Sequence, residues 1–221
     1  MKHLFYLHLD MNFTYLALGD SYTIGEQVML AESFPYQTVK LLRPASQLVL
    51  KKTTGSSQFS DPEIIAKTGW TTDELNAAID AANISRHYDI VSLLIGVNNQ
   101  YRNMSVNDFE IEFKQLLQRA ILFANNKPHH VFVLSIPDWG VTPFAKGRNR
   151  QQIEQEIDAY NAVCKTTAEK MECHYIDITA SQRADGNKAE FLAADGLHPS
   201  VKEYAKWAEK LAEAVSVIFN K

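Results

Sequence analysis

Two short segments near opposite ends of the chain contain the residue types that acyl-transfer chemistry needs. The segment "GDSY" contains Ser21, and the segment "DGLH" places Asp195 three residues before His198. A serine hydroxyl is a weak nucleophile until an imidazole accepts its proton. A carboxylate beside that imidazole orients it and stabilises its charged form. Ser21, His198 and Asp195 are therefore candidates for the nucleophile, the base and the partner of the base.

Two further segments offer hydrogen-bond donors for the oxyanion that such a reaction forms. The segment "KTGW" contains Gly69, and "GVNN" contains Asn98. The backbone N–H groups of Ser21 and Gly69 and the side-chain amide of Asn98 are donors of the kind that stabilise an oxyanion. Four of the nine glycines lie in these four segments, and glycine is typical of places where the backbone turns sharply or approaches a ligand.

Each of these residues also has an ordinary structural role. Ser21 suits a turn or a helix cap, Gly69 suits a loop, and Asn98 suits the cap of a strand end. Asp195 before a glycine suits a turn, and His198 suits a surface position or the start of a helix. Their joint occurrence, each at a predicted strand end or helix start, favours one common site over five separate structural roles.

The segments between these residues alternate between two patterns. Short apolar runs predict strands over 13–18, 47–51, 90–95, 130–135 and 173–177. Helical periodicity with start signals predicts helices from the Ser33 cap to about 42, from the capping box at 71–74 to about 83, and from Ser105 to about 124. The same pattern predicts helices over 151–171 and over 201–219, the last capped by Ser200 with Glu203.

This alternation is typical of an α/β domain with a mostly parallel sheet and helices on both faces. Right-handed crossovers bring the carboxyl ends of all strands to one edge, where ligands bind in open sheets of this kind. The four segments lie at or near that edge. We expect one domain over residues 1–221, in which residues 1–10 are a start-site artefact if Met11 is the natural start.

The composition excludes several classes of protein. Of the 221 residues, 46% are hydrophobic and 22% are charged, and the net charge of −4 includes no basic block for nucleic-acid phosphates. The two cysteines, Cys164 and Cys173, are too few for a disulfide framework or a structural zinc site, so we expect them in the core. His8 and Asp10 interrupt the N-terminal apolar run, which therefore predicts neither a signal peptide nor a membrane span, and we expect a cytoplasmic protein.

Four aromatic residues border the expected site: Trp70, Tyr101, Trp139 and Phe144. They suit the wall of an acyl or aryl pocket, or a surface on which a sugar ring stacks. They equally suit apolar plugs beneath the long loop at 137–150. The basic residues nearby suit an anionic head group or a solvated surface.

At these residues the sequence resembles the SGNH/GDSL hydrolase superfamily, and in particular its bacterial esterase and lysophospholipase-like branch. The blocks "GDSY", "TGW", "GVNN" and "DGLHPS" occur in the family's order, and the resemblance spans residues 13–219. It implies a three-layer, flavodoxin-like α/β/α fold with a five-stranded parallel sheet in the order 2-1-3-4-5. Tyr22 replaces the leucine of the family's name, and Asn99 stands where many relatives have aspartate.

The resemblance also implies roles for the site residues. It assigns Ser21 as nucleophile, His198 as base and Asp195 as its partner. It assigns an oxyanion hole to Ser21, Gly69 and Asn98, and it implies no metal and no organic cofactor.

The sequence therefore predicts a serine esterase for a small-molecule ester, either a short-chain acyl ester or a lysophospholipid. Carbohydrate acetyl esters are the alternative substrate class. A protein of another class, a non-catalytic ligand-binding module on the same fold, is the remaining alternative.

Overall fold

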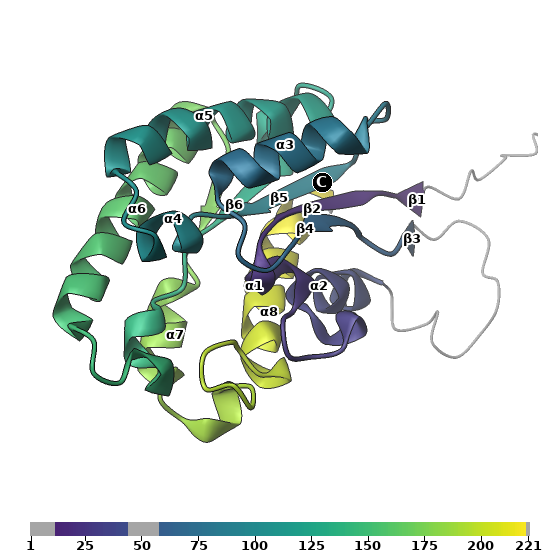
Figure 1. Ribbon diagram of the computed structural model, residues 1–221. Helices are drawn as coiled ribbons and strands as arrows, with labels where there is room; N and C mark the ends of the chain where they lie inside the picture. The colour runs from purple at the N-terminus through teal and green to yellow at the C-terminus, as the bar shows by residue number, and fades with distance from the viewer. Residues whose placement is uncertain (1–11, 44–57, 220–221) are drawn as a thin grey trace, which may run out of the picture.

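A parallel five-stranded sheet forms the centre of the protein (Figure 1), as seen in a computed structural model that describes residues 12–43 and 58–219. The sheet has the order β4-β2-β5-β6-β7. In chain order this is 2-1-3-4-5, so the predicted fold class and strand order are confirmed. The strands are β2 (Tyr15–Gly19), β4 (Glu63–Ala66), β5 (Ile90–Leu94), β6 (Val131–Leu134) and β7 (His174–Ile176).

The second strand of this sheet differs from the prediction. The strand expected at 47–51 lies outside the described residues, and the position beside β2 belongs to β4, for which no strand was predicted. β4 is a four-residue edge strand whose side chains are all only partly buried. A short, half-buried edge strand lacks the continuous apolar run that identifies a central strand. Before it, β1 (Asn12–Phe13) and β3 (Gln58–Phe59) form a separate two-stranded parallel pair.

Five long helices lie close to their predicted positions, and three shorter ones were not predicted. The long ones are α2 (Phe34–Leu42), α3 (Thr72–Ala82), α5 (Val106–Phe123), α6 (Arg150–Lys170) and α8 (Val201–Phe219). The short ones are α1 (Ser21–Ile24), α4 (Val97–Tyr101) and α7 (Thr179–Asp185). Helices of four to seven residues are too short for a 3.6-residue period to appear in the sequence.

The helices form one layer on each face of the sheet (Figure 1). Helices α2 and α8 pack against each other on one face, and α3, α5 and α6 form the layer on the other. Every residue of β2, β5 and β6 is buried, as expected for strands covered on both faces. Cys164 and Cys173 are buried and free, as predicted.

The helix starts follow their sequence signals with one difference. Thr71 and Glu74 form the predicted capping box of α3, and the Ser105 side chain caps α5. At the start of α8, Ser200 Oγ accepts the N–H of Lys202 (3.2 Å), but Glu203 is not part of a capping box. Its buried carboxylate instead accepts the indole N–H of Trp207 (3.0 Å), because that core N–H needs an acceptor.

Candidate active site

The nucleophile candidate lies where the central strand β2 ends and α1 begins. Asp20 caps α1, and its Oδ1 accepts the backbone N–H of Tyr22 (3.0 Å). This strand–turn–helix geometry places Ser21 as the first helical residue at the carboxyl edge of the sheet, with only 5% of its surface exposed. The turn that Gly, Asp and Ser favour is thus the feature that presents the hydroxyl.

Asp20 is a buried acid beside that hydroxyl. Burial raises the pKa of its carboxyl from 3.8 to about 7, and backbone hydrogen bonds act in the opposite direction. Its Oδ2 atom has no hydrogen-bond partner among the described residues. A carboxyl group in this setting is stable as the neutral acid at low pH and is costly to ionise.

The base candidate reaches Ser21 from the segment that precedes α8, 177 residues further along the chain. His198 Nε2 lies 3.1 Å from Ser21 Oγ, and His198 Nδ1 lies 2.6 Å from Asp195 Oδ2. When Nδ1–H donates to Asp195, Nε2 is free to accept the serine proton. The structure therefore joins the three residues in one hydrogen-bonded row.

Asp195 is held rigidly by its own backbone turn. Its Oδ1 accepts the N–H groups of Leu197 and His198, both at 3.0 Å, while Oδ2 contacts the imidazole. Burial alone raises the pKa of this carboxyl, but the hydrogen bonds from His198 and Leu197 outweigh it and leave the pKa below its ordinary value. Asp195 therefore remains an anion beside the imidazole.

The three oxyanion candidates come from three separate elements and line one cavity with His198. Gly69 lies between β4 and α3 with a φ of +84°, a left-handed conformation that favours glycine. A Cβ added there would meet no protein atom closer than 3.8 Å, so this side of Gly69 faces open space. Asn98 lies in α4, and its Nδ2 donates one hydrogen bond to the carbonyl of Trp70 (2.9 Å), which orients the amide.

Helix α4 fastens this part of the site to its surroundings. Arg102 Nη2 donates to the carbonyl of Gly69 (2.6 Å). Buried Asn99 accepts the N–H of Thr72 (3.1 Å) and donates to its hydroxyl (2.6 Å), which connects α4 to the start of α3. The role of Asn99, which the sequence left open, is thus structural in this arrangement. Its amide makes hydrogen bonds of both kinds to Thr72, which a carboxylate could not.

The start of α4 requires a glycine. Gly96 precedes the helix with a φ of +126°. A Cβ there would lie 2.7 Å from Ile136 Cδ1 and 2.8 Å from the ring of Phe109. Only glycine combines this conformation with this close packing, so the "GVNN" segment is shaped by its contacts with Ile136, which follows β6, and with α5 as well as by the site.

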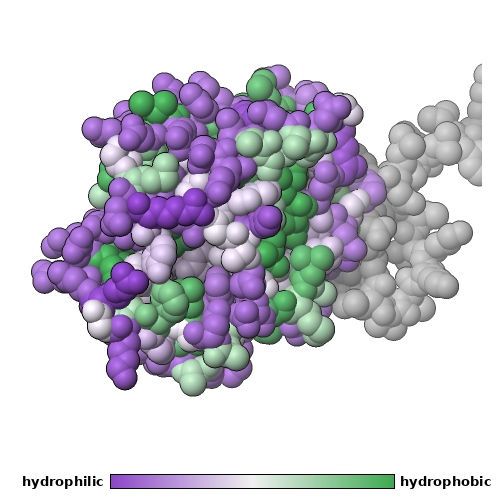
Figure 2. All heavy atoms as spheres, in the orientation of Figure 1, coloured by the Kyte–Doolittle hydropathy of each residue, from purple (hydrophilic) through white to green (hydrophobic). Residues whose placement is uncertain are grey.

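The cavity has a volume of about 190 Å³, and its walls are mainly apolar. Tyr101, Trp139 and Phe144 line it, as the sequence predicts for three of the four aromatic residues. The side chain of Trp70 does not line it and packs against the hydrophobic core. On the face drawn in Figure 2, hydrophilic residues cover most of the outer rim, and several hydrophobic patches lie toward the middle.

The long loop at 137–150 is fastened at several points. Buried Asp138 accepts the N–H of Gly140 (2.8 Å) and the Nε–H of Arg183 (2.8 Å). The N–H of Phe144 donates to the carbonyl of Gly196 (3.1 Å), which ties the loop to the segment that carries the base. The loop is therefore part of the cavity wall. From the sequence, only the aromatic residues of the loop indicated a place at the site, and the hydrogen bonds that anchor it could not be predicted.

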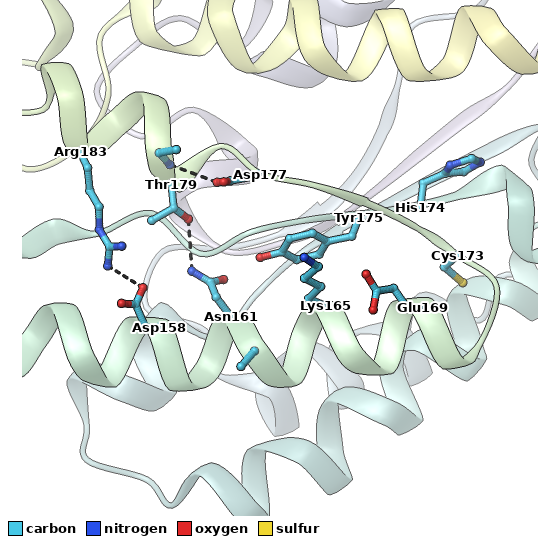
Figure 3. A pocket seen from close by; sticks show the side chains of 12 residues that line it. Asp158, Asn161, Lys165, Glu169, Cys173, His174, Tyr175, Asp177, Thr179 and Arg183 are labelled. Carbon is cyan, nitrogen blue, oxygen red and sulfur yellow. Dashed lines mark hydrogen bonds and ion pairs between the residues drawn. The ribbon is translucent and has the colours of Figure 1, made fainter.

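A second, larger hollow lies at the β7 edge of the sheet, with a volume of about 740 Å³. Figure 3 shows side chains from α6 facing side chains from β7 and α7 across it. Several of them are already paired, since Arg183 contacts Asp158 (2.8 Å) and Asn161 donates to Thr179 (3.2 Å). We refer to it as the β7 groove.

Residues 12–43 and 58–219 contain no cluster of three or more His, Cys, Asp or Glu side chains arranged to hold a metal ion. Within the same described ranges, no helix combines the length and the apolar character needed to cross a membrane.

Comparison with known proteins gives consistent results. The model of the GDSL-like Lipase/Acylhydrolase family matches residues 17–215. A lipase/acylhydrolase from Enterococcus faecalis has a similar structure, with a TM-score of 0.69 at 17% identity over 94% of this chain and 96% of the other. No curated protein sequence matches the chain.

Two other solved structures share the fold at similarly low identity. The psychrotrophic esterase EstA from Pseudoalteromonas sp., inhibited by monoethylphosphonate, has a TM-score of 0.69 at 14% identity, over 94% of this chain and 99% of that one. Axe2, an acetylxylan esterase from Geobacillus stearothermophilus, has a TM-score of 0.69 at 18% identity, over 94% and 96% of the two chains.

Proposed function

The chain belongs to the GDSL-like lipase/acylhydrolase family, and we propose that it is a serine hydrolase that cleaves carboxylic esters through an acyl-enzyme on Ser21. The observation that carries the proposal is the row of hydrogen bonds from Ser21 through His198 to Asp195 at the mouth of a cavity. A turn serine needs neither an imidazole at its hydroxyl nor an ionised carboxylate behind that imidazole.

The proposed reaction has two steps. His198 Nε2 accepts the Ser21 proton as Oγ attacks the ester carbonyl carbon, and the carbonyl π electrons move onto oxygen. The N–H groups of Ser21 and Gly69 and the Asn98 amide stabilise this oxyanion. When the carbonyl reforms, the C–O bond to the alcohol breaks, and the alkoxide takes the proton from His198. In the second step water attacks the carbonyl carbon of the acyl-enzyme while His198 accepts its proton. The bond to Ser21 Oγ then breaks, Oγ takes the proton from His198, and the acid leaves.

Asp195 acts through the imidazole in this scheme. Its carboxylate remains ionised because hydrogen bonds lower its pKa. It fixes the tautomer that leaves Nε2 free to accept the proton, and it stabilises the imidazolium that forms in each step.

The size of the cavity favours short acyl groups among the possible esters. Its volume of about 190 Å³ is below the roughly 300 Å³ at which pockets for drug-sized ligands begin. A lysophospholipid would have to leave much of its acyl chain outside this cavity. We therefore propose short-chain acyl esters as the substrate class.

Acetylated carbohydrate is the second candidate. A cavity of this size accepts an acetyl group, and the half-exposed rings of Tyr101 and Phe144 at its wall suit stacking against a sugar. The structural neighbour Axe2, an acetylxylan esterase, adds a reason to test this class.

A fluorophosphonate probe tests the proposed function directly. We expect the purified protein to gain one covalent adduct, located on Ser21 by peptide mass spectrometry, because the probe reacts with an activated serine. The Ser21→Ala and His198→Ala variants should remain unlabelled while retaining the wild-type melting temperature within a few degrees. An unlabelled but folded wild-type protein would support the alternative of a non-catalytic binding module.

A further inference from the structure

A small cavity, separate from the β7 groove, lies next to the cavity beside Ser21, on the far side of two aromatic side chains. This cavity, the second cavity below, has a volume of about 130 Å³ and is lined by residues of α4, the loop at 137–150 and α6. Two residues, Tyr101 and Trp139, border both cavities. They therefore stand between the space that faces the nucleophile and a further space into which a longer substrate would have to extend.

The two spaces differ in character. Val97 and Leu197 contribute apolar surface to the first cavity. The second contains mainly polar and charged side chains, including Asn103 and Glu156, with Ile153 as an apolar member. The aromatic wall therefore also separates an apolar compartment from a polar one.

The indole of Trp139 is held in place by a chain of hydrogen bonds that begins in the core and ends at the surface. Its Nε1–H donates to Gln100 Oε1 (2.8 Å), and Gln100 Nε2 donates to Glu156 Oε2 (2.6 Å). Gln152 Nε2 donates to the other carboxylate oxygen of Glu156 (2.8 Å). Trp139 and Gln100 are each only 4% exposed. Because the indole N–H and its acceptor are buried, the hydrogen bond between them fixes one orientation of the ring.

Tyr101 completes the wall from α4. Its ring meets Trp139 edge to face, with centroids 5.3 Å apart and planes at 68°. The guanidinium of Arg148 lies over the ring of Tyr101, 5.9 Å from its centroid. Tyr101 is 43% exposed, so it forms the outer part of the wall while Trp139 forms the buried part.

We propose that Trp139, positioned by Gln100 and completed by Tyr101, is a specificity-determining residue that limits the acyl chain to a few carbons. The inference rests on the proposed function, because it assigns the apolar cavity beside Ser21 to the acyl group. A short acyl chain ends against the indole, and a longer one meets a wall that cannot rotate away without breaking the hydrogen bond to Gln100. Removal of the indole joins the two cavities.

The test measures kcat/KM for p-nitrophenyl esters with acyl chains of two, four, eight and twelve carbons. We expect the wild-type protein to prefer the two shortest chains. Trp139→Ala should raise the ratio of the eight-carbon to the two-carbon ester at least tenfold. Tyr101→Ala should raise it by a smaller factor, and since this ring is half-exposed the variant decides the question if Trp139→Ala does not fold.

Phe144 provides a matched control. It is 44% exposed, as Tyr101 is, and contacts the same aromatic group, with its ring centroid 6.0 Å from that of Trp139. It borders the first cavity but not the second. Phe144→Ala should therefore change the chain-length ratio by less than threefold. An equal rise in the Phe144→Ala and Tyr101→Ala variants would overturn the role of the shared wall.

Gln100→Met tests the positioning role. It removes the acceptor of the indole N–H at nearly constant side-chain length, so we expect the eight-carbon to two-carbon ratio to rise, but less than in Trp139→Ala. A purely structural role of Gln100 would lower the rates on all esters by the same factor and leave the ratio unchanged.

The two proposals fail in different ways. If wild-type protein is labelled on Ser21 and hydrolyses esters, but Trp139→Ala and Tyr101→Ala keep the wild-type chain-length profile, only the wall is refuted. If wild-type protein is neither labelled nor active on any ester, the proposed function is refuted and the wall with it.

Discussion

Two hollows of this protein, the cavity beside Ser21 and the β7 groove, differ in more than their volumes. The β7 groove has a volume of about 740 Å³ and the cavity only about 190 Å³. In the groove, charged side chains such as Arg183 and Asp158 are paired with each other across its width (Figure 3). Such pairing satisfies the groups that would otherwise bind a ligand.

The cavity beside Ser21 shows the opposite arrangement. Its walls contain a hydroxyl in contact with an imidazole, an open glycine at a left-handed φ and an oriented amide. These groups come from separate elements that meet where the parallel strands end. The comparison teaches that the convergence of reactive and donor groups, and not volume, distinguishes a candidate active site from a surface hollow.

The largest effect that separates the two regions is expected at the nucleophile. Ser21→Ala should lower kcat for a short-chain ester by on the order of 10⁶, because it removes the atom that forms the acyl-enzyme. Initial rates measured over a wide range of enzyme concentration would check this. Wild-type-like hydrolysis by the variant would remove the distinction between the cavity and the β7 groove.

The second largest effect is expected at the oxyanion donors. Asn98→Ala should lower kcat roughly 10²–10³-fold with little change in KM, since the amide stabilises charge that develops only in the transition state. Full kinetic curves for the variant separate the two constants. An increase in KM at constant kcat would instead place Asn98 in ground-state binding.

Asp20, which lies beside the cavity, is expected to make the free energy of unfolding of the protein depend on pH. Its pKa is raised to about 7 from 3.8. The folded state therefore binds this proton more tightly than the unfolded state, and the wild type loses stability as the pH rises from about 4 to about 7. The loss from this group approaches about 4 kcal/mol, at about 1.4 kcal/mol per pKa unit.

Asp20→Asn removes that titration and retains a side-chain oxygen for the N–H of Tyr22. Urea unfolding of the variant and the wild type at a series of pH values measures the difference. The advantage of the variant should grow between pH 4 and 7 and then level off. A constant difference across this range would show that Asp20 does not hold a proton in the folded protein.

A smaller effect is expected at Arg102, which holds the carbonyl of Gly69. Its ion pair with Glu74 (3.3 Å) is largely exposed, so most of the loss comes from the hydrogen bond. Arg102→Ala should lower kcat/KM about fivefold, as expected for about 1 kcal/mol.

Arg119 is the matched control for Arg102. Arg119 also connects its own helix, α5, to α3: it donates to the carbonyl of Asn76 (3.1 Å) and pairs with Asp80 (2.6 Å). Neither of these partners lines the cavity, whereas Gly69, the partner of Arg102, does. Arg119→Ala should leave kcat/KM unchanged. Equal losses in the two arginine variants would show that Arg102 acts on the fold and not on the Gly69 loop.

The smallest effect is expected in the β7 groove. Lys165 and Glu169 are exposed side chains on α6 that line it. The double variant Lys165→Ala/Glu169→Ala should change kcat/KM for esters by less than about twofold, because neither side chain lines the cavity beside Ser21 and exposed substitutions of this kind usually change the stability of the fold by no more than about 0.5 kcal/mol. A larger loss of activity would connect the two hollows.

The predictions from sequence succeeded where the signal was local. The capping box at Thr71 and the cap at Ser105 mark helix starts within four residues, and both helices lie where predicted. The sequence also singled out Ser21, Asp195 and His198, which the structure joins by hydrogen bonds. Their catalytic roles stay a prediction until the variants are measured.

The predictions were incomplete where contacts between distant elements decide. β4 takes the place beside β2, although its half-buried residues carry no strong strand pattern. Glu203 turns into the core, where its Oε1 accepts the indole N–H of Trp207 and the hydroxyl of Ser181 from α7 (3.1 Å), although its spacing from Ser200 suits a capping box. In both cases a neighbouring element decides, β2 for β4 and α7 for Glu203, and the short-range sequence pattern does not show that neighbour.

The sequence by itself determined the fold class, the family and the residue types available for the chemistry, because these depend on periodicity, on helix caps and on motifs in a given order. Only the tertiary structure decided which aromatic residues face the nucleophile, that Gln100 holds Trp139, and that Arg102 holds the Gly69 carbonyl. Those contacts join elements that the sheet brings together from far along the chain, and their geometry is set by packing.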